Sequence, residues 1–215
     1  MTESASLMQT LKEETWDLHK KAETQPLEQN LVRGTLPQDV YVTYLEQRLI
    51  VMRAMEKHMA ALAAKDTRVA EMGYEPFMLA EHLEKDLKFF GSDPSALEPL
   101  SATSQFLRQL ESTTEKKPLA LLGVLYVFAG STNGAKFISR AILRAYELQP
   151  GQATNFLDPF GDEQRHIWGG FKTKMDETNW TAEEKKEIVS GALLGFASIM
   201  EVDRQTYTAP LAEAE

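Results

Sequence analysis

LLGVLYVFAGSTNGAKFISRAI, residues 121–142, is a largely apolar stretch that contains three glycines. Its apolar spacing predicts a long helix that ends near Leu148. Each glycine inside a helix costs about 1 kcal/mol relative to alanine, yet Gly123, Gly130 and Gly134 all fall here. Gly130 and Gly134 are one turn apart on the same helix face. Their spacing fits two explanations equally: a flat ligand that approaches the bare backbone, or close packing against another helix.

The composition extends this helical prediction to the whole chain. The 215 residues include 26 Leu, 23 Ala and 23 Glu, against only 9 Val and 6 Ile, and these proportions favour helices over strands. We therefore predict an all-α fold of seven to nine helices. Apolar spacing and prolines place them at about 4–24, 27–33, 37–64, 75–90, 94–115, 118–148, 162–177 and from 181 onward. No internal repeat or flexible linker divides them, so we expect a single domain over residues 1–215.

Particular residues predict several helix ends. Gly34 is expected to end the second segment, and Pro99 to interrupt the 94–115 segment with a restart at Ser104. Asp162 is a good N-cap for the helix that follows it. Thr181 is expected to cap the last helix, where the glutamate three residues later completes a capping box.

Charge and cysteine content exclude several classes of function. The chain has no cysteine, which excludes disulfides, cysteine-ligated zinc, thiolate ligation of iron and a cysteine nucleophile. A formal net charge of −9, without a run rich in Lys and Arg, argues against a nucleic-acid partner. The first residues do not form a signal peptide, and the apolar window 119–129 is too short to span a membrane. The expected compartment is the cytoplasm.

One histidine stands out by its position on the first predicted helix. The apolar stripe of this helix has His19 at its flank, and Lys12 lies almost directly behind it. Two helical turns separate these residues by about 10 Å, the distance from the centre of a flat macrocycle to an acidic group at its edge. One imidazole could therefore bind a metal while one ammonium group binds a carboxylate. The alternative is a partly buried histidine and an unrelated surface lysine.

The remaining histidines and a second basic pair have plainer explanations. His58 suits the end of a long helix, His82 lies on what we expect to be a solvated face with Asp86, and His166 is expected at the surface. In GDEQRHIWGGFKTKM, residues 161–175, Arg165 and Lys172 share one helix face, where they could bind carboxylates or only face solvent.

Four motifs, in order along nearly the whole chain, carry a resemblance to a known family. LKEETWDLHKKAE (11–23) resembles the first-helix signature of the heme oxygenase family, and YVFAGSTNGAKF (126–137) resembles its distal-helix glycine motif in the bacterial form. DLKFFG (86–91) and GDEQRHIWGGF (161–171) are also similar to bacterial family patterns. The resemblance implies a helical bundle that holds heme between the first, proximal helix and a kinked distal helix that contains the glycines.

The resemblance assigns a role to the iron-binding residue and to its neighbours. It implies that His19 is the heme-iron ligand, with Glu23 near it. Lys12, Tyr126 and Lys172 match residues that contact the heme propionates.

The other matched positions lie around the heme faces and edge. Gly130 and Gly134 match the glycines that pass over the heme, and Phe196 matches an aromatic residue near the heme edge. Trp168 occupies a position that is basic in the family, which makes Arg165 a candidate substitute. Ser131 replaces the aspartate of animal members, so the resemblance implies a different arrangement of distal water and proton delivery.

The resemblance also implies an activity and partners. Heme would be both cofactor and substrate, cleaved with O2 and electrons to biliverdin, CO and ferrous iron. The implied partners are a soluble electron donor, such as a ferredoxin, flavodoxin or flavin reductase, and a biliverdin acceptor such as a phytochrome. A neutral histidine suits this chemistry, because a thiolate ligand would favour O–O cleavage instead.

Three other functions are alternatives to heme cleavage. A non-catalytic heme-binding or heme-sensing protein on the same fold would keep His19 without turning heme over. A thiaminase-like protein on this fold would need a catalytic cysteine, which is missing. A di-iron oxidase would need several carboxylate and histidine ligands on core faces, which the scattered histidines do not provide.

Overall fold

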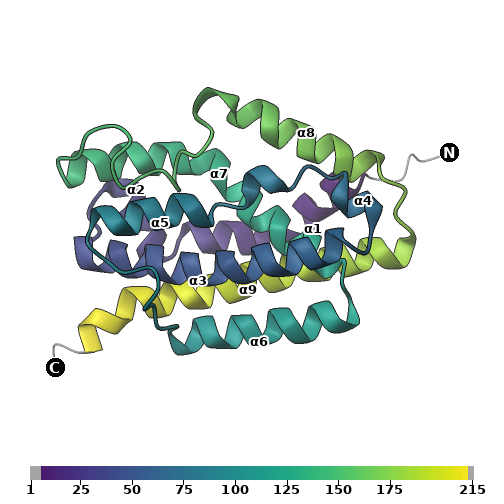
Figure 1. Ribbon diagram of the computed structural model, residues 1–215, viewed down its shortest axis with the longest axis horizontal. Helices are drawn as coiled ribbons and strands as arrows, with labels where there is room; N and C mark the ends of the chain where they lie inside the picture. The colour runs from purple at the N-terminus through teal and green to yellow at the C-terminus, as the bar shows by residue number, and fades with distance from the viewer. Residues whose placement is uncertain (1–5, 213–215) are drawn as a thin grey trace.

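The computed structural model describes residues 6–212, and within this range it contains nine α-helices, two short 3-10 helices and no strand (Figure 1). In chain order they are α1 (Leu7–Glu23), α2 (Pro26–Arg33), α3 (Gln38–Ala63), α4 (Thr67–Ala70), η1 (Glu75–Phe77), α5 (Ala80–Phe89), α6 (Ser101–Lys116), α7 (Ala120–Ala145), η2 (Gly161–Glu163), α8 (Gln164–Glu177) and α9 (Ala182–Ala212). The all-α prediction is confirmed.

Local sequence signals set several of the helix ends. Ser6 precedes α1, and its hydroxyl accepts a hydrogen bond from the Gln9 backbone N–H at 3.2 Å. The predicted start of this helix near Ser4 lies outside the described residues. Gly34 ends α2 with a φ of 68°, a left-handed conformation that glycine adopts without steric cost. This confirms the predicted stop.

The predicted capping box before α9 is also confirmed. The Thr181 backbone N–H donates to Glu184 Oε2 at 2.7 Å, and the Glu184 N–H donates to Thr181 Oγ1 at 3.2 Å. The pair satisfies two N–H groups that a helix start leaves without partners.

Two predicted helices begin later than expected. Residues 94–100 form turns and irregular chain, and α6 starts at Ser101 without any restart at Ser104, so the predicted 94–115 helix is wrong at its beginning. The predicted 75–90 helix is divided, because η1 ends at Phe77 and α5 begins only at Ala80. Pro76 lies in η1, where a proline at the start of a helical turn is tolerated.

The start of α8 and the segment after α3 differ as well. Asp162 lies inside η2 and does not cap α8, whose first residue is Gln164. The short helix α4 was not predicted, because four residues are too few to show apolar periodicity. Its cap is Asp66, whose carboxylate accepts a hydrogen bond from the Arg68 N–H at 3.0 Å.

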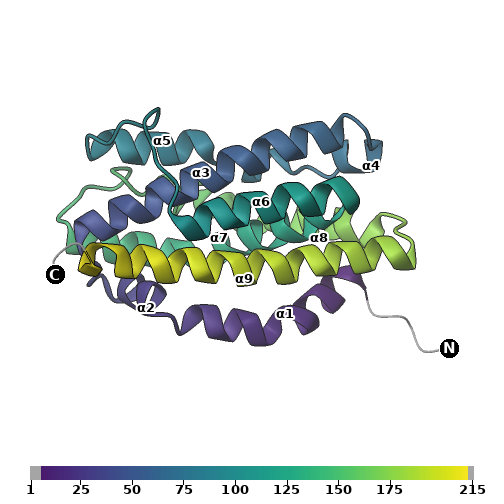
Figure 2. The same ribbon diagram turned by 90° about the horizontal axis from the view of Figure 1, so that it is seen from below.

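Helices α7 and α9 lie in direct backbone contact through the centre of the protein (Figure 2). A Cβ atom added to Gly123 would lie 1.8 Å from the Ile188 carbonyl oxygen, and one added to Gly191 would lie 1.7 Å from the Ala120 carbonyl oxygen. Both positions therefore require glycine. Close helix packing is the correct explanation for Gly123.

The apolar character of α7 is that of a central helix. By length and composition alone, α7 could cross a membrane, and no other helix of the described residues could. In the fold, 56% of its most apolar window is buried inside the protein.

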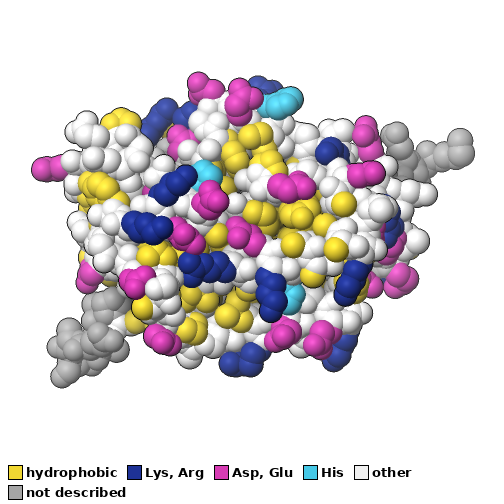
Figure 3. Space-filling view, in the orientation of Figure 1, with side chains coloured by type: hydrophobic (Ala, Val, Ile, Leu, Met, Phe, Trp, Pro, Cys, Tyr) yellow, Lys and Arg dark blue, Asp and Glu magenta, His cyan; other side chains and the backbone are white. Residues whose placement is uncertain are grey.

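The surface seen in Figure 3 carries charges of both signs. Lys and Arg side chains alternate there with Asp and Glu side chains, and no broad patch of one sign forms on this face. An extended basic face, which nucleic-acid binding would require, is therefore missing from this side of the described protein.

The arrangement of the remaining helices leaves α1 on one side of the molecule. In Figure 2, α1 and α2 lie on one side of α9, and α3 and α5 lie on the other. In Figure 1, α8 lies along one edge of the molecule next to α7. Residues of α1, α7, α8 and α9 line a common cavity.

Candidate functional site

A cavity of about 1400 Å³ lies between these helices. It is larger than the roughly 300–1,000 Å³ of most small-molecule pockets. All nine site residues predicted from the sequence line it, although they come from four helices: Lys12, His19, Glu23, Tyr126, Gly130, Ser131, Gly134, Lys172 and Phe196. The fold therefore brings them together around one space large enough for a macrocycle.

His19 is held at the cavity by neighbours on α1 and α9. Its Nδ1 lies 3.6 Å from Oε1 of Glu23, one turn further along the helix, and the two side chains are 47% and 67% exposed. The Trp16 ring stacks on the imidazole at a centroid distance of 5.8 Å, and Phe196 of α9 meets it edge-on at 6.0 Å. These contacts orient the ring and leave Nε2 as the nitrogen that does not face Glu23.

The glycines of α7 do not all serve one purpose. A Cβ on Gly134 would meet no atom within 4 Å, and one on Gly130 would meet only the Trp168 ring, at 3.8 Å. Gly130 and Gly134 thus present bare backbone to the cavity, whereas Gly123 packs against α9. Close helix packing therefore explains Gly123, whereas no close approach of a neighbouring backbone requires glycine at Gly130 or Gly134.

Side chains between these two glycines form hydrogen bonds with the α7 backbone itself. The hydroxyl of Ser131 donates to the Phe128 carbonyl at 2.8 Å, and that of Thr132 donates to the Ala129 carbonyl at 2.6 Å. Side-chain donors of this kind compete with the helical hydrogen bonds and bend helices. These side-chain bonds lie in the part of α7 that borders the cavity.

Cationic and phenolic groups line the cavity around Trp168. Lys172 Nζ lies 5.9 Å from the Trp168 ring centroid, and the Tyr126 ring is 6.0 Å from the same indole. Burial raises the pKa of Tyr126, so its hydroxyl stays protonated at neutral pH and remains a hydrogen-bond donor. With Lys12, these groups can bind carboxylates.

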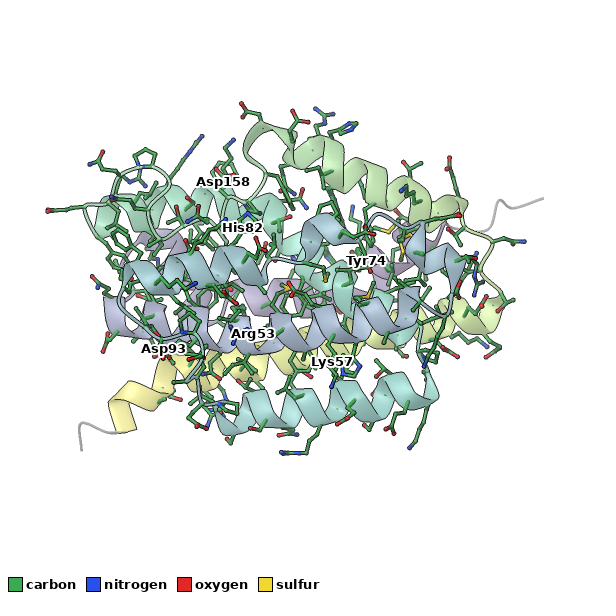
Figure 4. The ribbon with its side chains drawn as sticks, in the orientation of Figure 1. Arg53, Lys57, Tyr74, His82, Asp93 and Asp158 are labelled. Atoms are coloured by element: carbon green, nitrogen blue, oxygen red, sulfur yellow. The ribbon has the colours of Figure 1, made fainter. Side chains whose placement is uncertain are left out.

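Arg165 and the other histidines lie apart from this cavity. Arg165 and His166 are exposed and border a separate shallow depression, so Arg165 does not take the place expected for it beside Lys172. His82 lies on α5 and His58 on α3, on the opposite side of the bundle from α1 (Figures 2 and 4). Within the described residues, no group of three or more His, Asp or Glu side chains is placed to hold a metal ion.

We expected Asp86 to lie with His82 on a solvated face, and for Asp86 this expectation is wrong. This side chain is fully buried, and its carboxylate accepts hydrogen bonds from the backbone N–H groups of Asn155 and Phe156, both at 2.9 Å. Asp86 therefore fixes the loop after α7 to α5.

Sequence reasoning missed a buried ion pair in the cavity wall. Arg48 of α3 donates two hydrogen bonds to the Asp203 carboxylate of α9, at 2.7 and 3.0 Å, and the two side chains are only 7% and 6% exposed. The guanidinium also stacks over the Tyr44 ring at 4.6 Å. A signal was present: Arg48 lies one turn from both Tyr44 and Met52, on the apolar face of its helix.

Glu28 of α2 lies beside this ion pair and also lines the cavity. Its pKa is raised to about 7, first by burial and then by the nearby Asp203 carboxylate, while Arg48 opposes the shift. The carboxyl group therefore titrates near neutral pH, unlike an ordinary glutamate.

A protein-family model described as heme oxygenase matches residues 5–205. The chain belongs to the heme oxygenase family. It is 27% identical over 200 residues to heme oxygenase 1 of Gallus gallus, a match that covers 90% of this chain and 67% of that protein. It is 23% identical over 205 residues to heme oxygenase 2 of Oryctolagus cuniculus, covering 92% and 65%. The chain thus spans about two thirds of the length of these relatives.

Solved structures of bacterial heme oxygenases have the same fold. The structure of heme oxygenase from Leptospira interrogans superposes with a TM-score of 0.85 at 22% identity, over 94% of this chain and 100% of that one. Heme oxygenase-1 from the cyanobacterium Synechocystis, solved in complex with heme, also gives a TM-score of 0.85, at 20% identity over 98% and 96% of the two chains. These similarities confirm the heme oxygenase-like bundle.

Proposed function

We propose that this protein binds heme in the cavity beside α1 and cleaves it, with O2 and electrons, to biliverdin, CO and ferrous iron. The observation that carries the proposal is that His19 of α1 and the bare backbone of Gly130 and Gly134 of α7 border one cavity. Membership of the heme oxygenase family supports the same activity. Heme supplies both the redox-active iron and the tetrapyrrole that is cleaved.

The residues present fit a flat, largely apolar dianion. A Cβ atom at Gly134 would lie in open space, where any side chain would reduce the room for a planar ring. Large apolar side chains stand exposed where they border the cavity, with Trp16 at 48% and Phe137 at 69% exposure. Such exposure is costly in water and is relieved if an apolar ligand covers the side chains.

His19 is the iron ligand in this proposal, and Glu23 orients it. A proton on Nδ1 faces the Glu23 carboxylate, which leaves the Nε2 lone pair free for iron. A carboxylate beside the ring nitrogen that does not bind the metal makes the imidazole a better ligand.

Lys12, Lys172 and Tyr126 hold the two propionate groups. The ammonium groups supply charge and hydrogen bonds to the carboxylates, and the protonated Tyr126 hydroxyl supplies a further donor. Phe196 packs at the ring edge, where it also contacts the His19 imidazole.

The Gly130–Gly134 segment covers the face opposite His19. Ser131 brings no acid to this segment, since its hydroxyl is bound to the Phe128 carbonyl. We expect protons to reach this face through water held among the polar side chains of the segment.

The partners of this activity follow from the same chemistry. We propose a soluble electron donor, such as a ferredoxin, flavodoxin or flavin reductase, which acts on the protein in the cytoplasm. A biliverdin acceptor such as a phytochrome would take up the product. Addition of each purified donor to the heme complex, with the rate of heme loss as readout, identifies the one that supports turnover.

The test is a heme titration followed by reduction in air. We expect the protein to bind one heme, with a new Soret band, and reductant to replace that band with biliverdin absorbance. A stable Soret band without biliverdin would establish a non-catalytic heme-binding protein instead. Failure to bind heme would overturn both functions.

A further inference from the structure

The side chain of Gln164, the first residue of α8, joins α8 to the glycine segment of α7. Its amide nitrogen Nε2 lies 2.7 Å from Oγ1 of Thr132 and 3.2 Å from Oδ1 of Asn133. Thr132 is 5% exposed, and both α7 residues line the cavity, whereas Gln164 itself does not. Gln164 therefore reaches the cavity wall only through these two side chains.

The direction of each hydrogen bond in this group is fixed. The Thr132 hydroxyl gives its proton to the Ala129 carbonyl, and the Asn133 amide NH₂ donates to the Gly130 carbonyl at 2.8 Å. Oγ1 and Oδ1 can then only accept, so Gln164 must donate to both. One amide group thus sets the orientation of the two polar side chains next to the cavity.

The glycines of the segment that Gln164 holds have few side-chain neighbours. Gly130 and Gly134 contribute no side chains to packing, and the only side chain near Gly130 is Trp168, one turn after Gln164 on α8. An ion pair between Lys136 and Asp162 also links the two regions, at 3.2 Å, but Asp162 is fully exposed and such pairs contribute little.

We propose that Gln164 is a positioning residue that fixes the Gly130–Gly134 segment over the cavity and orients Thr132 and Asn133 toward it. The effect on turnover rests on the proposed function, but the effect on the segment does not. Ser131, Thr132 and Asn133 all lie between the two glycines, but only Thr132 and Asn133 accept hydrogen bonds from an amide of another helix, so their geometry depends on Gln164.

The first test needs no heme. In Gln164→Glu, two acceptor oxygens face Oγ1 and Oδ1, and in Gln164→Met both hydrogen bonds are lost with similar side-chain volume. We expect amide hydrogen exchange of residues 130–136 to become at least tenfold faster in both variants, while residues 121–127 exchange as in the unmodified protein. Asp162→Asn is the matched control, which weakens only the exposed ion pair and should leave exchange unchanged.

The second test uses the heme complex. We expect Gln164→Glu to lower kcat about tenfold with the heme dissociation constant within twofold of the unmodified value. Unchanged exchange of residues 130–136 in both Gln164 variants would overturn the proposal, as would a uniform loss of protection throughout the protein. If the unmodified protein fails to bind heme, the proposed function fails, whereas the exchange result still decides the role of Gln164.

Discussion

Nδ1 of His19 lies 3.6 Å from Oε1 of Glu23, one turn further along α1, and both side chains border the same cavity. The carboxylate is thus placed to hold the imidazole in the tautomer that leaves Nε2 free.

Replacement of Glu23 tests whether this contact tunes the iron ligand. Glu23→Gln should lower heme affinity or turnover about 10- to 100-fold, because partners of this kind orient metal-binding histidines. The ferric heme spectrum and the heme dissociation constant are the measurements. Glu14→Gln, on the same helix but exposed and away from the cavity, is the control. Equal behaviour of the two variants would contradict the role of Glu23.

Substitutions at two glycines of α7 should have opposite effects on the stability of the fold. Gly123→Ala should destabilise the fold by about 3 kcal/mol or more, because its Cβ would lie 1.8 Å from the Ile188 carbonyl oxygen. Gly134→Ala should instead raise the unfolding free energy by up to about 1 kcal/mol, the helical preference for alanine. Urea denaturation measures both changes.

A larger side chain at Gly134 should impair ligand binding without unfolding the protein. Gly134→Phe has open space for its Cβ, so we expect near-normal stability and a heme affinity lowered by at least tenfold. Normal heme affinity in a folded Gly134→Phe protein would show that the ring does not lie against this segment.

Glu28 should make stability depend on pH near neutrality. Burial is the main reason that its pKa rises from 4.5 to about 7 in the folded protein. Between these two pH values, Glu28 is therefore protonated in the folded state and ionised in the unfolded chain. The free energy of unfolding contributed by Glu28 therefore falls as pH rises from about 4.5 to 7 and is constant above that. Glu28→Gln removes this penalty, so the stability gain of the variant should grow with pH across this window, by about 3 kcal/mol at most. A gain that stays constant from pH 4 to 8 would contradict the assignment.

Removal of one partner of the Arg48–Asp203 pair should destabilise the fold much more than replacement of both partners by apolar side chains. Arg48→Met leaves a buried carboxylate without its partner and should cost about 3–5 kcal/mol of stability. In the double variant Arg48→Met, Asp203→Leu, most of this loss should be recovered, because no buried charge remains. Urea denaturation of the single and double variants measures the coupling, and additive losses would show that the two side chains are independent.

The parts of the fold that could be predicted from the sequence are those set by nearby residues. The Gly34 stop and the box formed by Thr181 and Glu184 depend on contacts within a few residues, and their residue types identify them. The start of α6 depends instead on α3. Gln47 donates to the Glu98 carbonyl at 3.1 Å and accepts from the Leu100 N–H at 2.9 Å, which keeps this segment out of a helix.

The same distinction holds for the site. The motifs that mark His19 and the α7 glycines are continuous in sequence, so they could be recognised before the cavity was seen. Arg48 and Asp203 are separated by 155 residues, and Gln164 lies 32 residues from Thr132. No local sequence pattern predicts such pairings, because they form only where α3 packs near α9 and α8 packs near α7.

The products of a single turnover show whether this protein cleaves heme through His19. Heme complexes of the unmodified protein and of His19→Ala would be reduced in air, with CO and biliverdin quantified together. We expect about one CO and one biliverdin for each heme from the unmodified protein, and neither from His19→Ala until imidazole is added. Heme loss without CO, or equal yields from the two proteins, would contradict this account.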